Sequence, residues 1–72
     1  MNKSFYHYMM KYRHALQKDE ISLFAINAYE DHAFPKNSFD YHEISSYLEV
    51  NGQYLDSMST FDKAWELYKQ DI

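Results

Sequence analysis

Large apolar residues recur along this chain with the period of an α-helix. In the C-terminal segment they are separated by steps of three, four, three and four residues, at Met58, Phe61, Trp65, Tyr68 and Ile72. Residues spaced in this way line one face of a helix. Only six residues are Val, Ile or Thr, the β-branched types that favour strands, and no segment alternates long enough to predict one. The chain is therefore predicted to be all-α.

Start and stop signals divide the chain into helices. Four are expected, near residues 4–13, 20–32, 41–50 and 57–70. Ser4 and Asp19 are candidate N-caps, because their side chains can accept a backbone N–H of the first turn. Pro35 forces the residue before it out of the helical region, so the second helix must end earlier. Asp40, with Glu43 three residues later, is typical of a capping box at the start of the third helix.

Five residues carry expectations about the core and the loops. Gly52 should end the third helix in the left-handed conformation, which glycine adopts without steric cost. Phe39 and Ile44 have the spacing of a hydrophobic staple, and Phe34 with Phe39 should pin the intervening loop to the core. Trp65 is expected to bury the largest single area, so its replacement by Ala should cost about 3–5 kcal/mol.

The length of 72 residues allows one domain, which we take as residues 1–72. There is no cysteine, so packing rather than disulfides must stabilise a small core. A deep pocket would consume that core, and we therefore expect no cofactor. The longest unbroken apolar run, Leu23–Ile26, is far shorter than the roughly 20 residues that span a bilayer. A cytoplasmic protein that does not enter the membrane is expected.

The net charge of −4 is unevenly distributed. Residues 1–18 carry four Lys and Arg and no acid, whereas residues 19–72 carry three Lys against eleven acids. Cations beside tyrosine rings, as in the first helix, are a combination that single-stranded nucleic acid binding uses. The residues of this hypothesis are Lys3, His7, Lys11 and Arg13. Against it, four cations are few, the isoelectric point is about 5.4, and the acidic remainder repels phosphate.

Metal binding and catalysis receive little support from the sequence. The candidate ligands are His32, Asp40, His42 and Glu43. His42-Glu43 lacks the second histidine that a zinc-binding HExxH helix needs, and two of the four residues already serve as helix caps. No nucleophile elbow or glycine-rich phosphate loop is present. We therefore expect neither a metal site nor an enzyme.

Protein interaction is the hypothesis that remains. Eight Tyr, five Phe, four Met and one Trp exceed what so small a core needs, and Tyr and Met are enriched at interfaces. The residues proposed for the interface are Tyr6, Met10, Leu23 and Ile26. The alternative is that the bundle itself covers all of them, with the tyrosine hydroxyls in water.

Several short sequences, taken together, resemble one known family. They are SFY (4–6), MKYR (10–13), FPK (34–36), DYHEISSYLE (40–49), NG (51–52), FD (61–62) and AW (64–65). The chain is similar along its length to the YozE family of small uncharacterised bacterial proteins. This resemblance implies a compact four-helix bundle similar to the sterile alpha motif (SAM-like) fold, and it brings no catalytic or binding residues with it.

SAM-like domains elsewhere serve mostly in protein interaction, some of them by self-association, and a few bind nucleic acid. Likeness of fold is a weak guide to function. The chain is expected to be a small interaction module for an unidentified protein partner or a second copy of itself. The alternative is nucleic-acid binding through the basic first helix.

Overall fold

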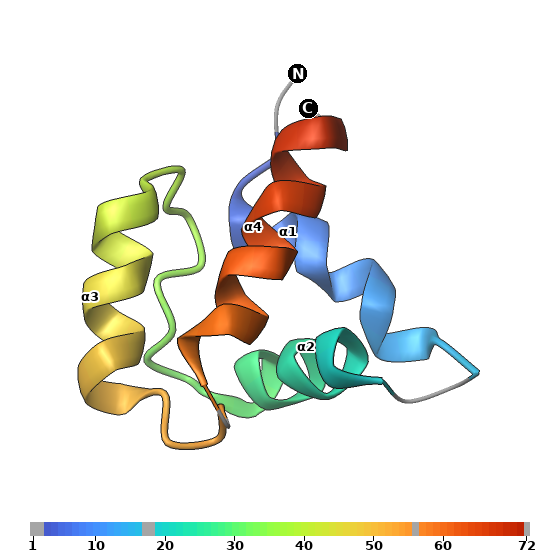
Figure 1. The fold of residues 1–72 in the computed structure, drawn as a ribbon, viewed down its shortest axis with the longest axis horizontal. Coiled ribbons are helices and arrows are strands. Elements are labelled where there is room, and N and C mark those ends of the chain that lie inside the picture. Colours follow the sequence, from blue (N-terminus) through green and yellow to red (C-terminus); the bar gives the residue numbers. More distant parts are fainter. Residues whose placement is uncertain (1–2, 17–18, 56, 72) are drawn as a thin grey trace.

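The computed structural model describes residues 3–16, 19–55 and 57–71. Within these ranges all regular structure is helical, which confirms the predicted fold class. The elements are α1 (Phe5–Met9), the 3₁₀-helix η1 (Met10–His14), α2 (Glu20–Glu30), α3 (Tyr41–Asn51) and α4 (Met58–Asp71). Figure 1 shows α2 lying across the N-terminal end of α4, with α3 on one side of α4 and α1–η1 on the other.

Two of the predicted helix ends differ from the structure by more than one residue. The first helix was expected to continue to residue 13, but the α-helix ends at Met9 and the chain goes on as η1. The N–H of Met10 is shared between the carbonyls of Tyr6 and His7, which tightens the winding. The tighter turn packs η1 against α2. The second helix ends at Glu30 rather than residue 32, because Asp31 adopts extended backbone.

The N-caps predicted at Ser4, Asp19 and Asp40 are confirmed. The capping box at the third helix, however, differs from the expected one. Asp40 accepts from the N–H of His42 at 3.0 Å, but Glu43 does not reach back to the Asp40 N–H. Instead, Ser38 Oγ donates to Glu43 Oε1 at 2.6 Å and accepts the Asp40 N–H at 3.1 Å. The buried Ser38 hydroxyl thus mediates the contact that the box would make directly.

The loop before α3 is held by one phenylalanine rather than two. Phe34 is buried, with its ring 5.7 Å from that of Tyr6 and 5.8 Å from that of Tyr47. Phe39 is 55% exposed, so the expectation that it pins the loop is wrong. The hydrogen bonds of Ser38 fix this end of the loop, and they leave Phe39 directed to solvent.

The centre of the core is Phe5, not Trp65. Phe5 is fully buried, and its ring lies 5.5 Å from Phe61, 5.6 Å from Tyr68 and 5.3 Å from Trp65. Trp65 packs against this core and is only partly buried. Its outer side faces a surface hollow that Tyr41 also lines.

Gly52 ends α3 for a different reason from the one expected. Its φ is −90°, so it does not adopt the left-handed conformation. Its N–H donates to the carbonyl of Leu48 at 2.8 Å, and a Cβ at position 52 would lie 2.6 Å from that oxygen. Glycine is required here because the chain passes so close to the preceding turn.

Candidate interaction surface

Of the residues proposed for an interface, Leu23 offers the most exposed side chain. Leu23 is 50% exposed on α2. Met10 and Ile26 are half-buried, and they lie on η1 and α2, which pack against each other. Tyr6 is buried beneath Phe34. The four residues are therefore not all covered within the chain, and the possible contact surface centres on Leu23.

A hollow of about 340 Å³ opens beside Leu23. Phe24, Tyr54 and Leu55 form the rest of its apolar lining, so α2 supplies one wall and the segment after α3 supplies the other. Phe24 itself is buried, with its ring 6.5 Å from that of Tyr54. The hollow therefore gives a partner side chain access to the edge of the hydrophobic core.

Two carboxylates lie at the α2 N-terminal end of this hollow. Asp19 caps α2 by accepting the Ser22 N–H at 2.9 Å, and this bond lowers the pKa of its carboxyl. Glu20 accepts from Lys63 Nζ and from Thr60 Oγ1, and these bonds lower its pKa as well. Both groups are ionised at neutral pH.

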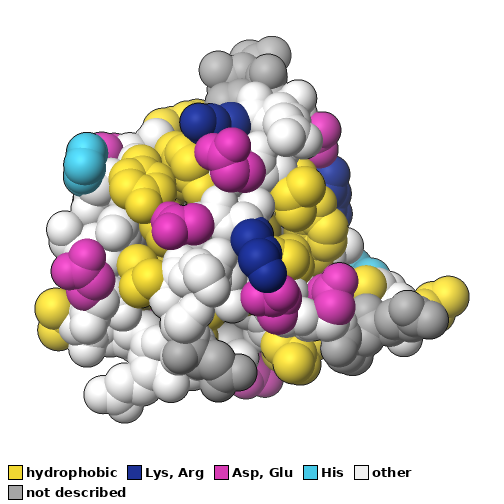
Figure 2. All heavy atoms as spheres, viewed as in Figure 1, with side chains coloured by type: hydrophobic (Ala, Val, Ile, Leu, Met, Phe, Trp, Pro, Cys, Tyr) yellow, Lys and Arg dark blue, Asp and Glu magenta, His cyan; other side chains and the backbone are white. Residues whose placement is uncertain are grey.

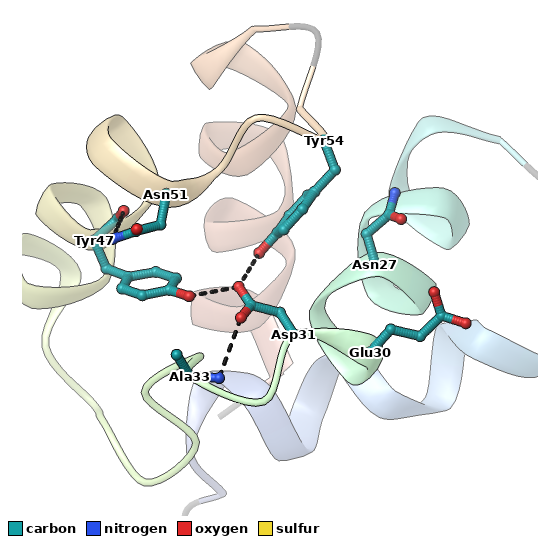
Figure 3. Close-up of a pocket in the computed structure, with 7 residues that line it drawn as sticks. All are labelled: Asn27, Glu30, Asp31, Ala33, Tyr47, Asn51 and Tyr54. Atoms are coloured by element: carbon teal, nitrogen blue, oxygen red, sulfur yellow. Dashed lines mark hydrogen bonds between the residues drawn. The ribbon is translucent and has the colours of Figure 1, made fainter.

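A second hollow, of about 440 Å³, lies at the other end of α2 (Figure 3). Its polar lining includes Glu30 and Asp31 from the end of α2 and Asn51 from the end of α3. Asn27 and Tyr54 line both this hollow and the one beside Leu23. The two hollows therefore adjoin along the outer face of α2.

The carboxylate of Asp31 joins three parts of the fold. Tyr47 of α3 donates its phenol to Asp31 Oδ2 at 2.6 Å, and Tyr54 of the following segment donates to the same oxygen at 3.0 Å. The N–H of Ala33 donates to Oδ1 at 3.2 Å. Figure 3 shows both phenols pointing at this carboxylate, Tyr47 from α3 and Tyr54 from the segment that follows α3. We call these three residues, Asp31, Tyr47 and Tyr54, the Asp31 tie.

The titration of the Asp31 tie follows from these contacts. Partial burial acts to raise the pKa of Asp31, but the bonds from Tyr47, Tyr54 and the Ala33 N–H outweigh it and lower the pKa. Burial and the bond to Asp31 raise the pKa of Tyr47 to about 12, and the same two causes raise the pKa of Tyr54 further. At neutral pH the tie is therefore an ionised carboxylate held by two neutral phenols.

No pattern in the sequence predicted the Asp31 tie. Tyr47 has the spacing of an inward-facing residue of α3, whereas Tyr54 lies in the loop and Asp31 follows α2 directly. Nothing in their spacing shows that the three side chains meet. The one hint in the sequence is the position of Asp31, an acidic residue between the end of α2 and the Phe34-Pro35 turn.

The proposed nucleic-acid residues do not form a free basic face. Lys11 Nζ forms an ion pair with Asp71 at 2.9 Å and lies 4.4 Å from the centre of the Tyr8 ring. The guanidinium of Arg13 lies 4.0 Å from the centre of the Tyr29 ring. Two of the four proposed residues are thus engaged within the chain.

The other two, Lys3 and His7, lie around the start of α1. His7 is exposed, and its Nδ1 is 3.1 Å from Ser4 Oγ. Lys3 is exposed as well, and its backbone carbonyl accepts from the hydroxyl of Tyr68 at 2.6 Å. On the face seen in Figure 2, Asp and Glu side chains are spread among hydrophobic ones, and Lys and Arg are fewer.

Neither a metal centre nor a membrane-spanning helix is found in the described part of the chain. Residues 3–16, 19–55 and 57–71 contain no group of three or more His, Cys, Asp or Glu side chains placed to hold a metal ion. None of the helices within those ranges is both long and apolar enough to cross a membrane.

Comparison with known proteins gives consistent matches over nearly the whole chain. A family model described as the YozE SAM-like fold matches residues 4–70. The UPF0346 protein YozE of Bacillus subtilis is 64% identical over 70 residues, which cover 97% of this chain and 95% of that protein. A UPF0346 protein of Bacillus pumilus is 67% identical over 70 residues, with the same coverage.

A solved structure agrees with these matches. The solution NMR structure of the UPF0346 protein yozE from Bacillus subtilis superposes with a TM-score of 0.80 at 67% sequence identity. The superposition covers 93% of this chain and 82% of that one. The four-helix arrangement in Figure 1 is thus the SAM-like arrangement that the sequence resemblance implied.

Proposed function

The chain belongs to the family of the YozE SAM-like fold, and from this premise we propose that it is a small cytoplasmic protein-interaction module. The family is uncharacterised, so the proposal depends on the surface of this chain. The observation that carries it is the 50% exposure of Leu23 in a hollow lined by Phe24, Tyr54 and Leu55.

The energetics favour a protein partner at this hollow. Full burial of a leucine side chain contributes about 1.5–3 kcal/mol, so covering the exposed half of Leu23 would contribute about 1 kcal/mol. A partner side chain that enters the hollow would bury its own apolar surface as well. A central apolar contact with polar groups around it is the usual anatomy of a protein interface.

Site-specific photo-crosslinking tests this proposal. A photoreactive phenylalanine analogue is placed at Leu23 and, as a matched control, at Val50, which is 73% exposed on α3 and lines neither hollow. Each variant is expressed in Bacillus subtilis that lacks its own YozE. We expect protein adducts from position 23 and none from position 50. Equal labelling at both positions, or none at either, would contradict the proposal.

Nucleic-acid binding is the competing hypothesis, and the pairing of Lys11 and the stacking of Arg13 weigh against it. A titration against labelled single-stranded DNA and RNA near 50 mM salt decides between the two, because phosphate contacts are strongest at low salt. We expect no saturable binding. Binding that is lost in the Lys3→Ala, His7→Ala double variant would favour the competing hypothesis.

A further inference from the structure

The two hollows along α2 form one trough, which we call the α2 trough. They share Asn27 and Tyr54, so they adjoin at the middle of the helix. One side of the trough is the outer face of α2, and the other includes the segment that follows α3. Leu23 and Leu55 make the trough apolar near one end.

The charges of the trough have one sign at both ends. Asp19 and Glu20 line it where α2 begins, and Glu30 and Asp31 line it where α2 stops. No Lys or Arg is among the described residues that line either hollow. Lys63 offsets part of the charge of Glu20 from outside the lining. The electrostatic complement of this surface is an occupant with a positive charge at each end.

Helix geometry sets the spacing that the occupant needs. A rise of 1.5 Å per residue places Glu20 about 15–17 Å from Glu30 and Asp31 along α2, with Leu23 about 5 Å from the first end. An extended peptide advances about 3.3 Å per residue, so some five residues separate the two charges. The apolar side chain then lies nearer to one charge than to the other.

The far end of the trough favours a guanidinium. Tyr47 and Tyr54 line it together with Glu30 and Asp31, and Figure 3 shows the Glu30 side chain extending away from the two rings. A planar guanidinium stacks on aromatic rings and donates to carboxylates at the same time, and it loses less hydration than an ammonium.

We propose that the α2 trough binds an extended segment of a partner protein in which two arginines flank an apolar side chain. The apolar side chain packs on Leu23 and Leu55, one arginine lies beside Asp19 and Glu20, and the other enters the hollow at Glu30. This inference rests on the proposed function and specifies the chemistry of the partner.

Peptide binding measured by fluorescence anisotropy tests the inference. The probe is a fluorescein-labelled, acetylated peptide of serines with Arg, Leu and Arg at its second, fourth and seventh positions. Its control has the same composition, with the two arginines adjacent and the leucine at the end. We expect saturable binding of the probe, at least tenfold weaker binding of the control, and weakening of both with salt. Equal affinity for the two peptides would overturn the inference, because net charge alone would then explain the binding.

Variants of the protein locate the contact. Glu30→Gln and Leu23→Ser should each lower the affinity for the probe peptide about tenfold. Glu49→Gln and Val50→Ser make the same chemical changes at exposed positions of α3 that do not line the trough, so they should leave the affinity unchanged. Equal losses in the trough variants and their controls would overturn the inference.

The failure of this inference is distinguishable from that of the proposed function. If the probe does not bind but protein adducts form at position 23, the inference of an arginine-containing partner is overturned. The proposal that the chain is an interaction module is then retained. Sedimentation equilibrium covers the case of self-association. A dimer that Leu23→Ser dissociates, with no probe binding, would identify a second copy as the occupant and overturn the inference.

Discussion

Breaking the Asp31 tie should destabilise the fold by an amount that the structure allows us to estimate. The single variants are Tyr47→Phe, Tyr54→Phe and Asp31→Ala. Each phenylalanine substitution removes one hydroxyl that donates to the carboxylate, at 2.6 Å or 3.0 Å, and keeps the ring. The alanine substitution removes the acceptor of both bonds.

The magnitude follows from the kind of hydrogen bond. A bond to a charged group contributes about 1.5–3 kcal/mol, and the partial exposure of Asp31 places these two at or below the lower end. We therefore expect a loss of about 1 kcal/mol for each phenylalanine variant and about 2 kcal/mol for Asp31→Ala. A domain of this size has a total stability of about 4–11 kcal/mol, so all three variants should remain folded.

The assay is equilibrium urea unfolding followed by the fluorescence of Trp65, whose partly buried ring packs against the core. The double variant Asp31→Ala, Tyr47→Phe completes a cycle. Its coupling energy should be about 1 kcal/mol, because Tyr47 loses its partner in the alanine background. Tyr29→Phe is the control, since Tyr29 is exposed, and it should change the stability by less than about 0.5 kcal/mol.

One result would refute the reasoning. If Tyr47→Phe costs no more than the Tyr29→Phe control and the cycle shows no coupling, then the phenol bonds do not hold α3 to the end of α2. The lowered pKa of Asp31 would then lack the cause assigned to it here.

Three further outcomes are expected. Gly52→Ala should cost about 1–3 kcal/mol in urea unfolding, because its Cβ would meet the Leu48 carbonyl oxygen at 2.6 Å; a neutral result would contradict the close approach. Phe5→Ala should lower the stability by about 3–5 kcal/mol, or leave the chain unfolded by circular dichroism, whereas Phe39→Ala should stay within about 0.5 kcal/mol; equal losses would refute the placement of the core. The folded-state pKa of Tyr47 lies above its ordinary value of 10.0, so its contribution is present below pH 10 and is lost as the pH rises towards about 12; urea unfolding at several alkaline pH values should show less of this loss in Tyr47→Phe.

Local signals in the sequence predicted the helices well because each signal acts within a few residues. The side chains of Asp19 and Asp40 bind N–H groups of their own first turns, and these caps are as expected. The predicted capping box at Glu43 was wrong because the bond that replaces it comes from outside the range of the capping-box rule. Ser38, five residues earlier, offered a closer hydroxyl at 2.6 Å, and a spacing rule of three residues does not include it.

Depth in the core could not be predicted from periodicity. The spacing of the C-terminal segment shows which face of α4 turns inward, but it does not rank the residues on that face. Trp65 lies on that face and is only partly buried, whereas Phe5, from a helix of only five residues, is completely enclosed. Which ring reaches the centre depends on how α1 crosses α4, and this is a property of the assembled fold.

Part of the candidate site could be predicted from the sequence and part could not. Leu23 was identified because an apolar residue on the outer side of an amphipathic helix is visible in the sequence. The hollow beside it was not, because Leu55 and Tyr54 come from a segment far along the chain. The Asp31 tie depends on three separate segments and has no counterpart in any local pattern.

Stability and recognition use the α2 trough in different ways. Asp31 Oδ2 already accepts two phenols, and Oδ1 accepts the Ala33 N–H, so little of this carboxylate remains for a partner. The charge available to an arginine at that end therefore comes mainly from Glu30, which is exposed. The same tie fixes the ring of Tyr54, so the wall of the trough is rigid before a partner arrives, and the partner need not supply the ordering free energy. Asp31 thus shapes the trough, and its neighbour Glu30 recognises the ligand. Glu30→Gln therefore tests recognition without loosening the fold.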